Sequence, residues 1–228
     1  MGTGLVTASY IAASVLFILS LGGLSNQEKA KRAIWFGMIG MFIAVVATIL
    51  GPKVKLSIFG YLLPALIVGS VIGTILARRV QMTEMPQLVA ALHSFVGLAA
   101  VFIGLNSAIL PPIDLTPSEI IIHEVEIFLG IFIGAITFTG SVVAYGKLAG
   151  TIDGKALILP GRHYLNVGLL FLSLALGWMF LSHFGFWTLL VMTLIAFVIG
   201  AHLVYAIGGA DMPVVVSMLN SYSGWAAA

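Results

Sequence analysis

A histidine and an asparagine occupy matching places in two similar apolar segments of the sequence. Residues 84–97 align without gaps with residues 211–224 and share identical Met, Pro, Val, Leu, Ser and Gly positions. His93 in the first copy corresponds to Asn220 in the second. An imidazole takes up and releases protons near neutral pH, and an asparagine amide both donates and accepts hydrogen bonds. The pattern favours a proton-handling site. The alternative is a structural histidine that bonds across helices.

Each copy also carries the signals of a helix start. A carboxylate, Glu84 or Asp211, is followed by Met-Pro. Negative charge and proline both suit the first turn of a helix. At 1.5 Å per residue, His93 and Asn220 then lie about 12 Å along their helices. If the two helices face each other, these side chains meet at similar depth. The serines that follow them in the two copies are Ser94 and Ser221.

A third set of polar residues lies within residues 121–145. Glu126 shares a helix face with Gly130 and Gly134, whose spacing lets another helix approach closely. Thr137 and Ser141 are four residues apart and share a face. We predict an outer proton entry at Glu126 and an inner hydroxyl relay at Ser141. The alternative is helix capping, with hydroxyls that bond back to carbonyls four residues earlier.

The elements that position these residues follow from composition. The chain has 228 residues, of which 61% are hydrophobic and 8% charged, whereas soluble domains have about 25% charged residues. Apolar runs are continuous over about 20 residues, as membrane helices require, and do not alternate as barrel strands do. We predict an all-α integral membrane protein, a polytopic bundle of about eight transmembrane helices. Helices 4 and 8 form a parallel internal repeat.

The predicted spans also give an orientation. They are residues 5–21, 33–50, 58–77, 85–105, 121–145, 165–181, 186–207 and 212–228. Connections are short, so residues 1–228 form a single transmembrane domain. Odd-numbered loops carry eight of the ten Lys and Arg residues, and such loops stay in the cytoplasm. The N-terminus is therefore expected outside.

Several kinds of chemistry are excluded. The chain has no cysteine, so it has no disulfide and no thiolate nucleophile or ligand. No histidine pair has metal-site spacing, and no Walker motif, G-x-G-x-x-G motif or nucleophile elbow occurs. We therefore expect no metal site within this chain.

Three stretches resemble one known family. Residues 82–97, 128–144 and 208–227 closely resemble the beta subunit of proton-translocating nicotinamide nucleotide transhydrogenase, and the resemblance covers nearly the whole chain. It implies the membrane part of that subunit. The family couples hydride transfer from NADH to NADP+ to inward proton movement. A further helix and a soluble NADP(H)-binding domain are expected after residue 228.

The resemblance also implies roles for residues and partners. The residues that match the family's proton path are His93, Ser141 and Asn220. Glu126 and Asp211 match positions where changes impair coupling, and Asp211 is expected to face the NADP(H)-binding domain. The implied partners are alpha-subunit membrane helices, NAD(H)- and NADP(H)-binding domains and a second copy of the whole complex, in a bacterial inner membrane.

Two other functions are compatible with the composition. A secondary transporter with a polar site near the midplane often has repeats, but no span here has an unwound Gly-Pro centre or a buried charge pair. A purely structural membrane subunit is the other alternative.

Overall fold

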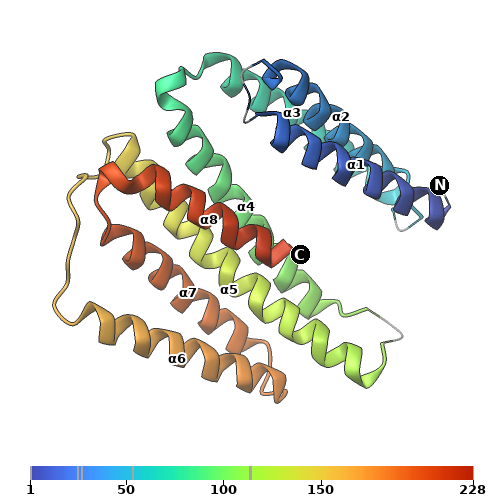
Figure 1. Cartoon of the computed structure of the whole chain (residues 1–228). Coiled ribbons are helices and arrows are strands. Elements are labelled where there is room, and N and C mark those ends of the chain that lie inside the picture. Colours follow the sequence, from blue (N-terminus) through green and yellow to red (C-terminus); the bar gives the residue numbers. More distant parts are fainter. Residues whose placement is uncertain (1, 25, 27, 53, 113–114, 228) are drawn as a thin grey trace. The chain divides into compact units, whose positions relative to one another are not determined.

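The computed structural model describes residues 2–24, 26, 28–52, 54–112 and 115–227, and the regular structure of these residues is helical (Figure 1). The chain divides into two compact units, Met1–Arg79 and Val80–Ala228. The helices of the first unit are α1 (Thr3–Leu24), α2 (Ala30–Ile49), η1 (Leu56–Ile58) and α3 (Phe59–Arg79). Those of the second are η2 (Met82–Glu84), α4 (Met85–Ile109), α5 (Pro117–Leu148), α6 (Arg162–Leu181), α7 (Trp187–Tyr205), η3 (Gly209–Asp211) and α8 (Met212–Ala227).

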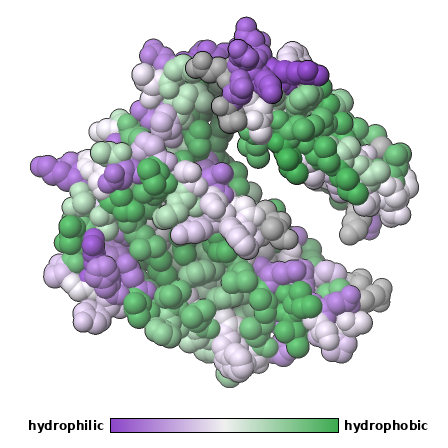
Figure 2. Space-filling view, in the orientation of Figure 1, coloured by the Kyte–Doolittle hydropathy of each residue, from purple (hydrophilic) through white to green (hydrophobic). Residues whose placement is uncertain are grey.

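The helical prediction is confirmed, and each predicted span coincides with a helix. Among the described residues, seven helices are long and apolar enough to cross a membrane, whereas α8 has 16 residues. Broad hydrophobic areas cover the visible faces of both units (Figure 2). The largest differences from the predicted ends are four residues each, at the end of α4 and at the start of α5. Thr116 and Glu119 cap this helix reciprocally, with Thr116 N donating to Glu119 Oε2 at 2.8 Å, so the helix begins before its apolar run.

In the first unit, small residues join α1 to α2. Ala13 and Ala33 are buried, and a Cβ atom on Gly40 would lie 3.1 Å from the Ala13 carbonyl oxygen. The backbones therefore touch, as small-residue interfaces in membranes allow. None of the side chains described for α3 is buried.

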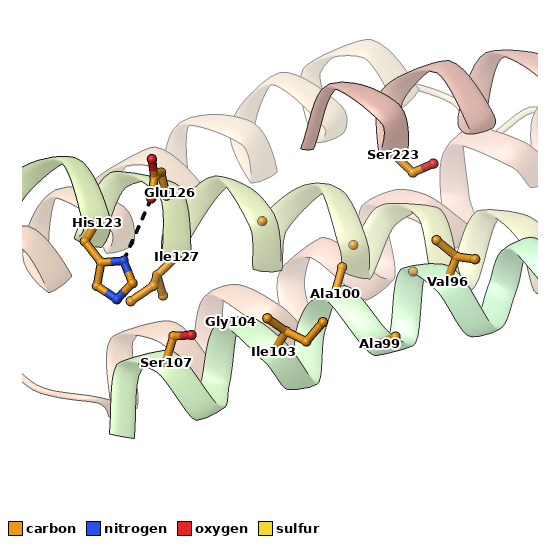
Figure 3. A pocket seen from close by; sticks show the side chains of 13 residues that line it. Val96, Ala99, Ala100, Ile103, Gly104, Ser107, His123, Glu126, Ile127 and Ser223 are labelled. Atoms are coloured by element: carbon orange, nitrogen blue, oxygen red, sulfur yellow. Dashed lines mark ion pairs between the residues drawn. The ribbon is translucent and has the colours of Figure 1, made fainter. Parts of the chain in front are cut away.

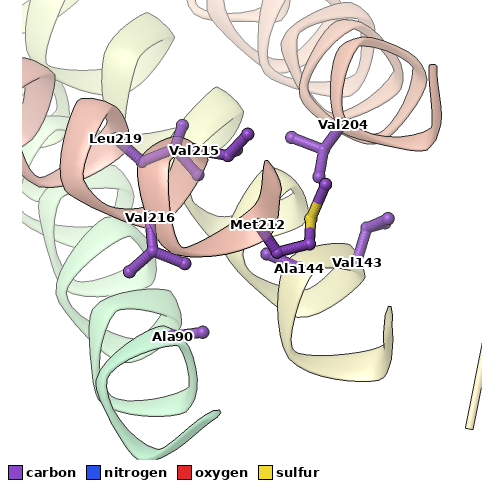
Figure 4. Close-up of a cluster of buried hydrophobic side chains, with 8 residues drawn as sticks. All are labelled: Ala90, Val143, Ala144, Val204, Met212, Val215, Val216 and Leu219. Carbon is purple, nitrogen blue, oxygen red and sulfur yellow. The ribbon is translucent and has the colours of Figure 1, made fainter. Parts of the chain in front are cut away.

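In the second unit, α5 is the central helix. It packs against α4, α7 and α8, while α6 packs mainly on α7 (Figure 1). Two buried apolar clusters fill the contacts along α5. One of them, where α4, α5, α7 and α8 meet, is formed by Ala90, Val143, Ala144, Val204, Met212, Val215, Val216 and Leu219 (Figure 4).

Glycines set the distance between α4 and α5. A Cβ atom on Gly97 would lie 2.6 Å from the backbone nitrogen of Phe138, and one on Gly134 would lie 2.8 Å from the Gly97 carbonyl oxygen. No side chain larger than hydrogen fits at either position unless the helices separate. This contact fixes the register of the two helices that carry the candidate residues.

Gly134→Ala is expected to lower the midpoint of thermal unfolding, because the added methyl group meets the backbone of α4. Overpacking of this kind costs roughly 1–3 kcal/mol. Gly130→Ala is the control, since a Cβ atom at Gly130 has no neighbour within 4 Å. Tryptophan fluorescence during heating in detergent measures both midpoints. Equal midpoints for the two variants would contradict the backbone contact.

Candidate functional site

His93 is buried where α4 meets α8. Its side chain is 5% exposed, and its Nε2 atom lies 3.2 Å from the hydroxyl oxygen of Ser223 on α8. The same hydroxyl donates to the carbonyl oxygen of Asn220 at 3.0 Å. Because a hydroxyl has one proton, Ser223 accepts from the Nε2–H of His93 while it donates to that carbonyl. In the neutral ring, Nδ1 is then the nitrogen that can accept a proton.

The helix register brings Ser141 level with His93. Gly97 lies against Phe138, and Ala90 belongs to the same buried cluster as Val143 and Ala144 (Figure 4). His93 lies between these two levels on α4. Since α4 and α5 run in opposite directions, the facing stretch of α5 is the turn that contains Ser141.

Two hydroxyls of α5 are buried without a partner. The side-chain oxygens of Thr137 and Ser141 make no hydrogen bond to any described residue, and both residues are 0% exposed. Thr139 instead bonds back to the Ala135 carbonyl oxygen at 3.2 Å. An unsatisfied buried polar group costs about 1–3 kcal/mol. The back-bonding alternative therefore describes Thr139, whereas the hydroxyls of Thr137 and Ser141 make no such bond among the described residues.

The remaining residues of the two similar segments point elsewhere. Ser94 is buried, and its hydroxyl donates to the Ala91 carbonyl oxygen at 2.7 Å. Asn220 and Ser221 are exposed on α8, and no hydrogen bond joins the side chains of Asn220 and His93 in the described part of the chain. Helix α8 is rotated so that Ser223, three residues further on, reaches the imidazole. The sequence comparison missed Ser223 because its counterpart, Val96, has no polar group.

A groove leads from the other end of α5 to this site. It has a volume of about 420 Å³ and lies between α4 and α5 (Figure 3). Ser107, His123 and Glu126 line one end, and Gly97 and Ser223 line the other. The Glu126 carboxylate is 70% exposed and lies 3.8 Å from Nδ1 of His123. The groove therefore connects Glu126 with the serine that bonds to His93.

At the opposite end of α5, Lys147 joins three segments. Its side chain is buried, and the ammonium group donates to the carbonyl oxygens of Lys155 at 3.2 Å, Tyr205 at 2.9 Å and Ile207 at 2.6 Å. In the sequence, Lys147 stands out only as one of the eight positive charges of the odd-numbered loops. The structure shows that it ties the connection after α5 to the end of α7.

The same connection is bonded to the turn before α8. Gly209 N donates to the Gly154 carbonyl oxygen at 2.7 Å. Asp211, two residues later, is exposed at the last position of η3. Asp211 therefore lies at the start of α8. The turn that carries it is bonded to the connection after α5, the same connection that Lys147 holds.

The other histidines do not form a metal centre. No group of three or more His, Cys, Asp or Glu residues with metal-site geometry occurs among the residues described. His202 Nδ1 lies 2.7 Å from Asn166 Oδ1, and His183 Nδ1 lies 3.6 Å from Glu124 Oε1.

Comparison with known proteins identifies the family. Residues 6–228 match the NAD(P) transhydrogenase beta subunit family. The chain belongs to this family. It is also 47% identical over 234 aligned positions to two curated relatives, both NAD(P) transhydrogenase subunit beta from Rhodospirillum rubrum, one of them from strain ATCC 11170. The alignments cover 100% of this chain and 49% of each relative, so the chain spans about half the length of these relatives. This part of the transhydrogenase beta subunit is a multi-pass membrane protein.

Lys147→Met is expected to loosen the connection after α5, because three carbonyl groups lose their donor. A hydrogen bond to a charged group is worth roughly 1.5–3 kcal/mol. We expect a lower thermal midpoint and faster protease cleavage within residues 149–161. Lys155→Met is the control, since the side chain of Lys155 is exposed. The prediction fails if both variants are cleaved at the rate of the unmodified protein.

Proposed function

We propose that the chain is the proton-conducting membrane part of a proton-translocating transhydrogenase. In the complex, hydride transfer from NADH to NADP+ is coupled to inward proton movement. The observation that carries the proposal is the buried imidazole of His93, hydrogen-bonded across helices to Ser223 at the inner end of a groove that begins at Glu126. An imidazole at this depth in a membrane is costly, and its usual reason is function.

The proton route follows the groove. A proton enters beside Glu126 and passes along water in the groove to Nδ1 of His93, while Ser223 holds the ring in place by accepting from its Nε2–H. The free hydroxyl of Ser141, level with His93, holds the water that leads further inward. His93 is the one ionisable group among these three residues, so it carries the charge while the two serines orient hydrogen bonds.

Asn220, Ser94 and Ser221 support this route. Ser94 is buried beside His93. Asn220 and Ser221 are exposed on α8 in this chain, and a polar side chain that faces hydrocarbon is unfavourable. We therefore place water and a covering helix of the alpha subunit against this face of α8. Asn220 then holds water between the two subunits.

Coupling to the nucleotides runs through the inner helix ends. Gln87, near the start of α4, donates to the Leu148 carbonyl oxygen at 3.0 Å, and the buried cluster of Figure 4 packs α8 on α5. A shift of α4 or α8 when His93 changes charge therefore moves Asp211 and the segment held by Lys147. These elements face the NADP(H)-binding domain, and such coupling needs two conformations with different proton affinity.

The membrane topology is part of the proposal. Helices α4 and α8 run in the same direction (Figure 1), and a 3-10 turn that ends in a carboxylate precedes each one. These features support a parallel repeat with α8 as an eighth span. The Lys and Arg distribution supports an N-terminus outside a bacterial inner membrane.

Nucleotides are bound elsewhere in the complex. The sequence of this chain has no phosphate-binding fingerprint, so we assign NADP(H) and NAD(H) to soluble domains outside these 228 residues. Residues 1–228 act as one transmembrane domain within a complex that contains the alpha subunit and dimerises. The chain by itself transfers no hydride.

His93→Leu is expected to abolish proton movement coupled to hydride transfer, because leucine cannot carry a proton. The measurement is pH change in vesicles that contain the whole complex, with NADH and NADP+ supplied. His163→Leu is the control, since His163 is exposed at the start of α6. Normal proton movement in His93→Leu would exclude the relay.

Flux driven by another solute without nucleotides would indicate a transporter, and no flux in the unmodified complex would indicate a structural subunit.

Ser223→Ala is expected to slow coupled proton movement up to about tenfold, which corresponds to the loss of one hydrogen bond worth about 0.5–1.5 kcal/mol. Ser217→Ala is the matched control on the same helix, where the serine is exposed. Initial rates of proton uptake in the same vesicles provide the measurement. Equal rates for the two variants would show that the contact between His93 and Ser223 has no part in the path.

A further inference from the structure

A second cavity lies beyond the groove, towards the outer ends of α4, α5 and α6. It has a volume of about 360 Å³. Residues that line it and not the groove include Pro111, Pro112, Leu115, Glu124 and Phe180. Three residues line both cavities: Ser107, His123 and Ile127. These three residues form the wall between the outer cavity and the groove.

His123 is the one ionisable group of this wall, and its two ring nitrogens have different surroundings. Nδ1 lies 3.8 Å from Glu126 Oε2 (Figure 3). Nε2 is buried and has no hydrogen-bond partner among the described residues. A neutral ring with its proton on Nδ1 suits these surroundings. The Nδ1–H faces the Glu126 carboxylate, and the unprotonated Nε2 needs no hydrogen-bond acceptor.

A charged ring does not suit the same position. A second proton makes Nε2 a donor, and a buried donor without an acceptor is unfavourable by about 1–3 kcal/mol. The side chain is 25% exposed, so it has room to turn, and a turn of the ring brings the new N–H to water in one of the two cavities. Protonation therefore favours movement of the ring.

We infer that His123 passes protons through the wall from the outer cavity into the groove. This inference rests on the proposed function and adds a residue to the proton path. In each cycle the neutral ring gains one proton at Nε2 from water of the outer cavity, turns as the charged imidazolium, and releases that same proton from Nε2 to the Glu126 carboxylate or to groove water. The neutral ring, which has kept its proton on Nδ1 throughout, then turns back to its first state, so one proton enters and one leaves.

The charges around His123 support this direction of transfer. Glu126, on the same helix, is the acceptor at the mouth of the groove. Glu124 lines the outer cavity, and its carboxylate lies 3.6 Å from His183 in the turn after α6. From α4, the polar group shared by both cavities is the neutral hydroxyl of Ser107. A carboxylate therefore stands on each side of the wall, and His123 lies between them.

The first test separates proton transfer from the filling of space. In the whole complex, His123→Phe keeps a ring in the wall but cannot carry a proton, and we expect coupled proton movement to fall at least tenfold. His123→Ala is expected to fall similarly and to recover in part when imidazole is added on the outer side. Wild-type rates in His123→Phe would overturn the inference. A loss in His123→Ala that imidazole does not restore would also overturn it.

The second test asks whether water reaches both cavities. Residues 1–228 contain no cysteine, so each cysteine introduced here is the single thiol within these residues. Ala108→Cys, in the outer cavity, is expected to react with a charged, membrane-impermeant thiol reagent added outside. Ala100→Cys, in the groove, is expected to react more slowly than Ala108→Cys and to gain reactivity in the His123→Ala background. Ala175→Cys, exposed on α6, reports background labelling.

The outcomes distinguish this inference from the proposed function. No labelling of Ala100→Cys even in the His123→Ala background would mean that a helix fills the groove, and the inference would fall. If His93→Leu abolishes proton movement while His123→Phe does not, His93 remains the relay and only the role of His123 is wrong. If His93→Leu moves protons normally, the proposed function itself fails.

Discussion

The structure depends on the need to satisfy polar groups where water is scarce. In the interior of a membrane protein an imidazole or hydroxyl must find a partner on a neighbouring helix or in trapped water. His93 meets this need through Ser223. The contact is possible because α4 packs directly on the backbone of α5 at Gly97 and Gly134, and because α8 packs through Val216 and Leu219 in the buried cluster with Ala90. The position of the imidazole therefore depends directly on the close packing of these helices.

The sequence predicted the helices well because the membrane leaves few alternatives. Continuous apolar runs near 20 residues have to be helical in lipid, and each one became a helix. The ends were harder to predict, since they depend on local capping such as that by Thr116 and Glu119. The sequence also indicated His93 and Ser141 as polar residues at buried depth. It could not indicate Ser223 or the bonds of Lys147, because these depend on the rotation of α8 and on which carbonyls α7 leaves free.

The two ends of α5 carry different kinds of polar structure. At one end, Glu126 and His123 border cavities of about 420 and 360 Å³ and have few partners. At the other, the Lys147 ammonium group is fully occupied by backbone carbonyls and holds a long connection in place. A proton path needs groups that can change partners, whereas a docking surface for another domain needs a fixed shape. Between the two ends, a buried apolar cluster packs α5 against α7 and α8.

The exposed face of α8 carries polar side chains. Asn220 and Ser221 are exposed, although α8 packs against α5 through buried Val215 and Leu219. Polar side chains that face hydrocarbon are unfavourable and would be lost from a helix that touched only lipid. A covering helix would leave the His93–Ser223 contact inside a closed interface and place Asn220 beside it. In the function that we propose, the beta subunit would then supply the titrating group and part of its surroundings, and the remaining wall of the proton path would belong to a partner.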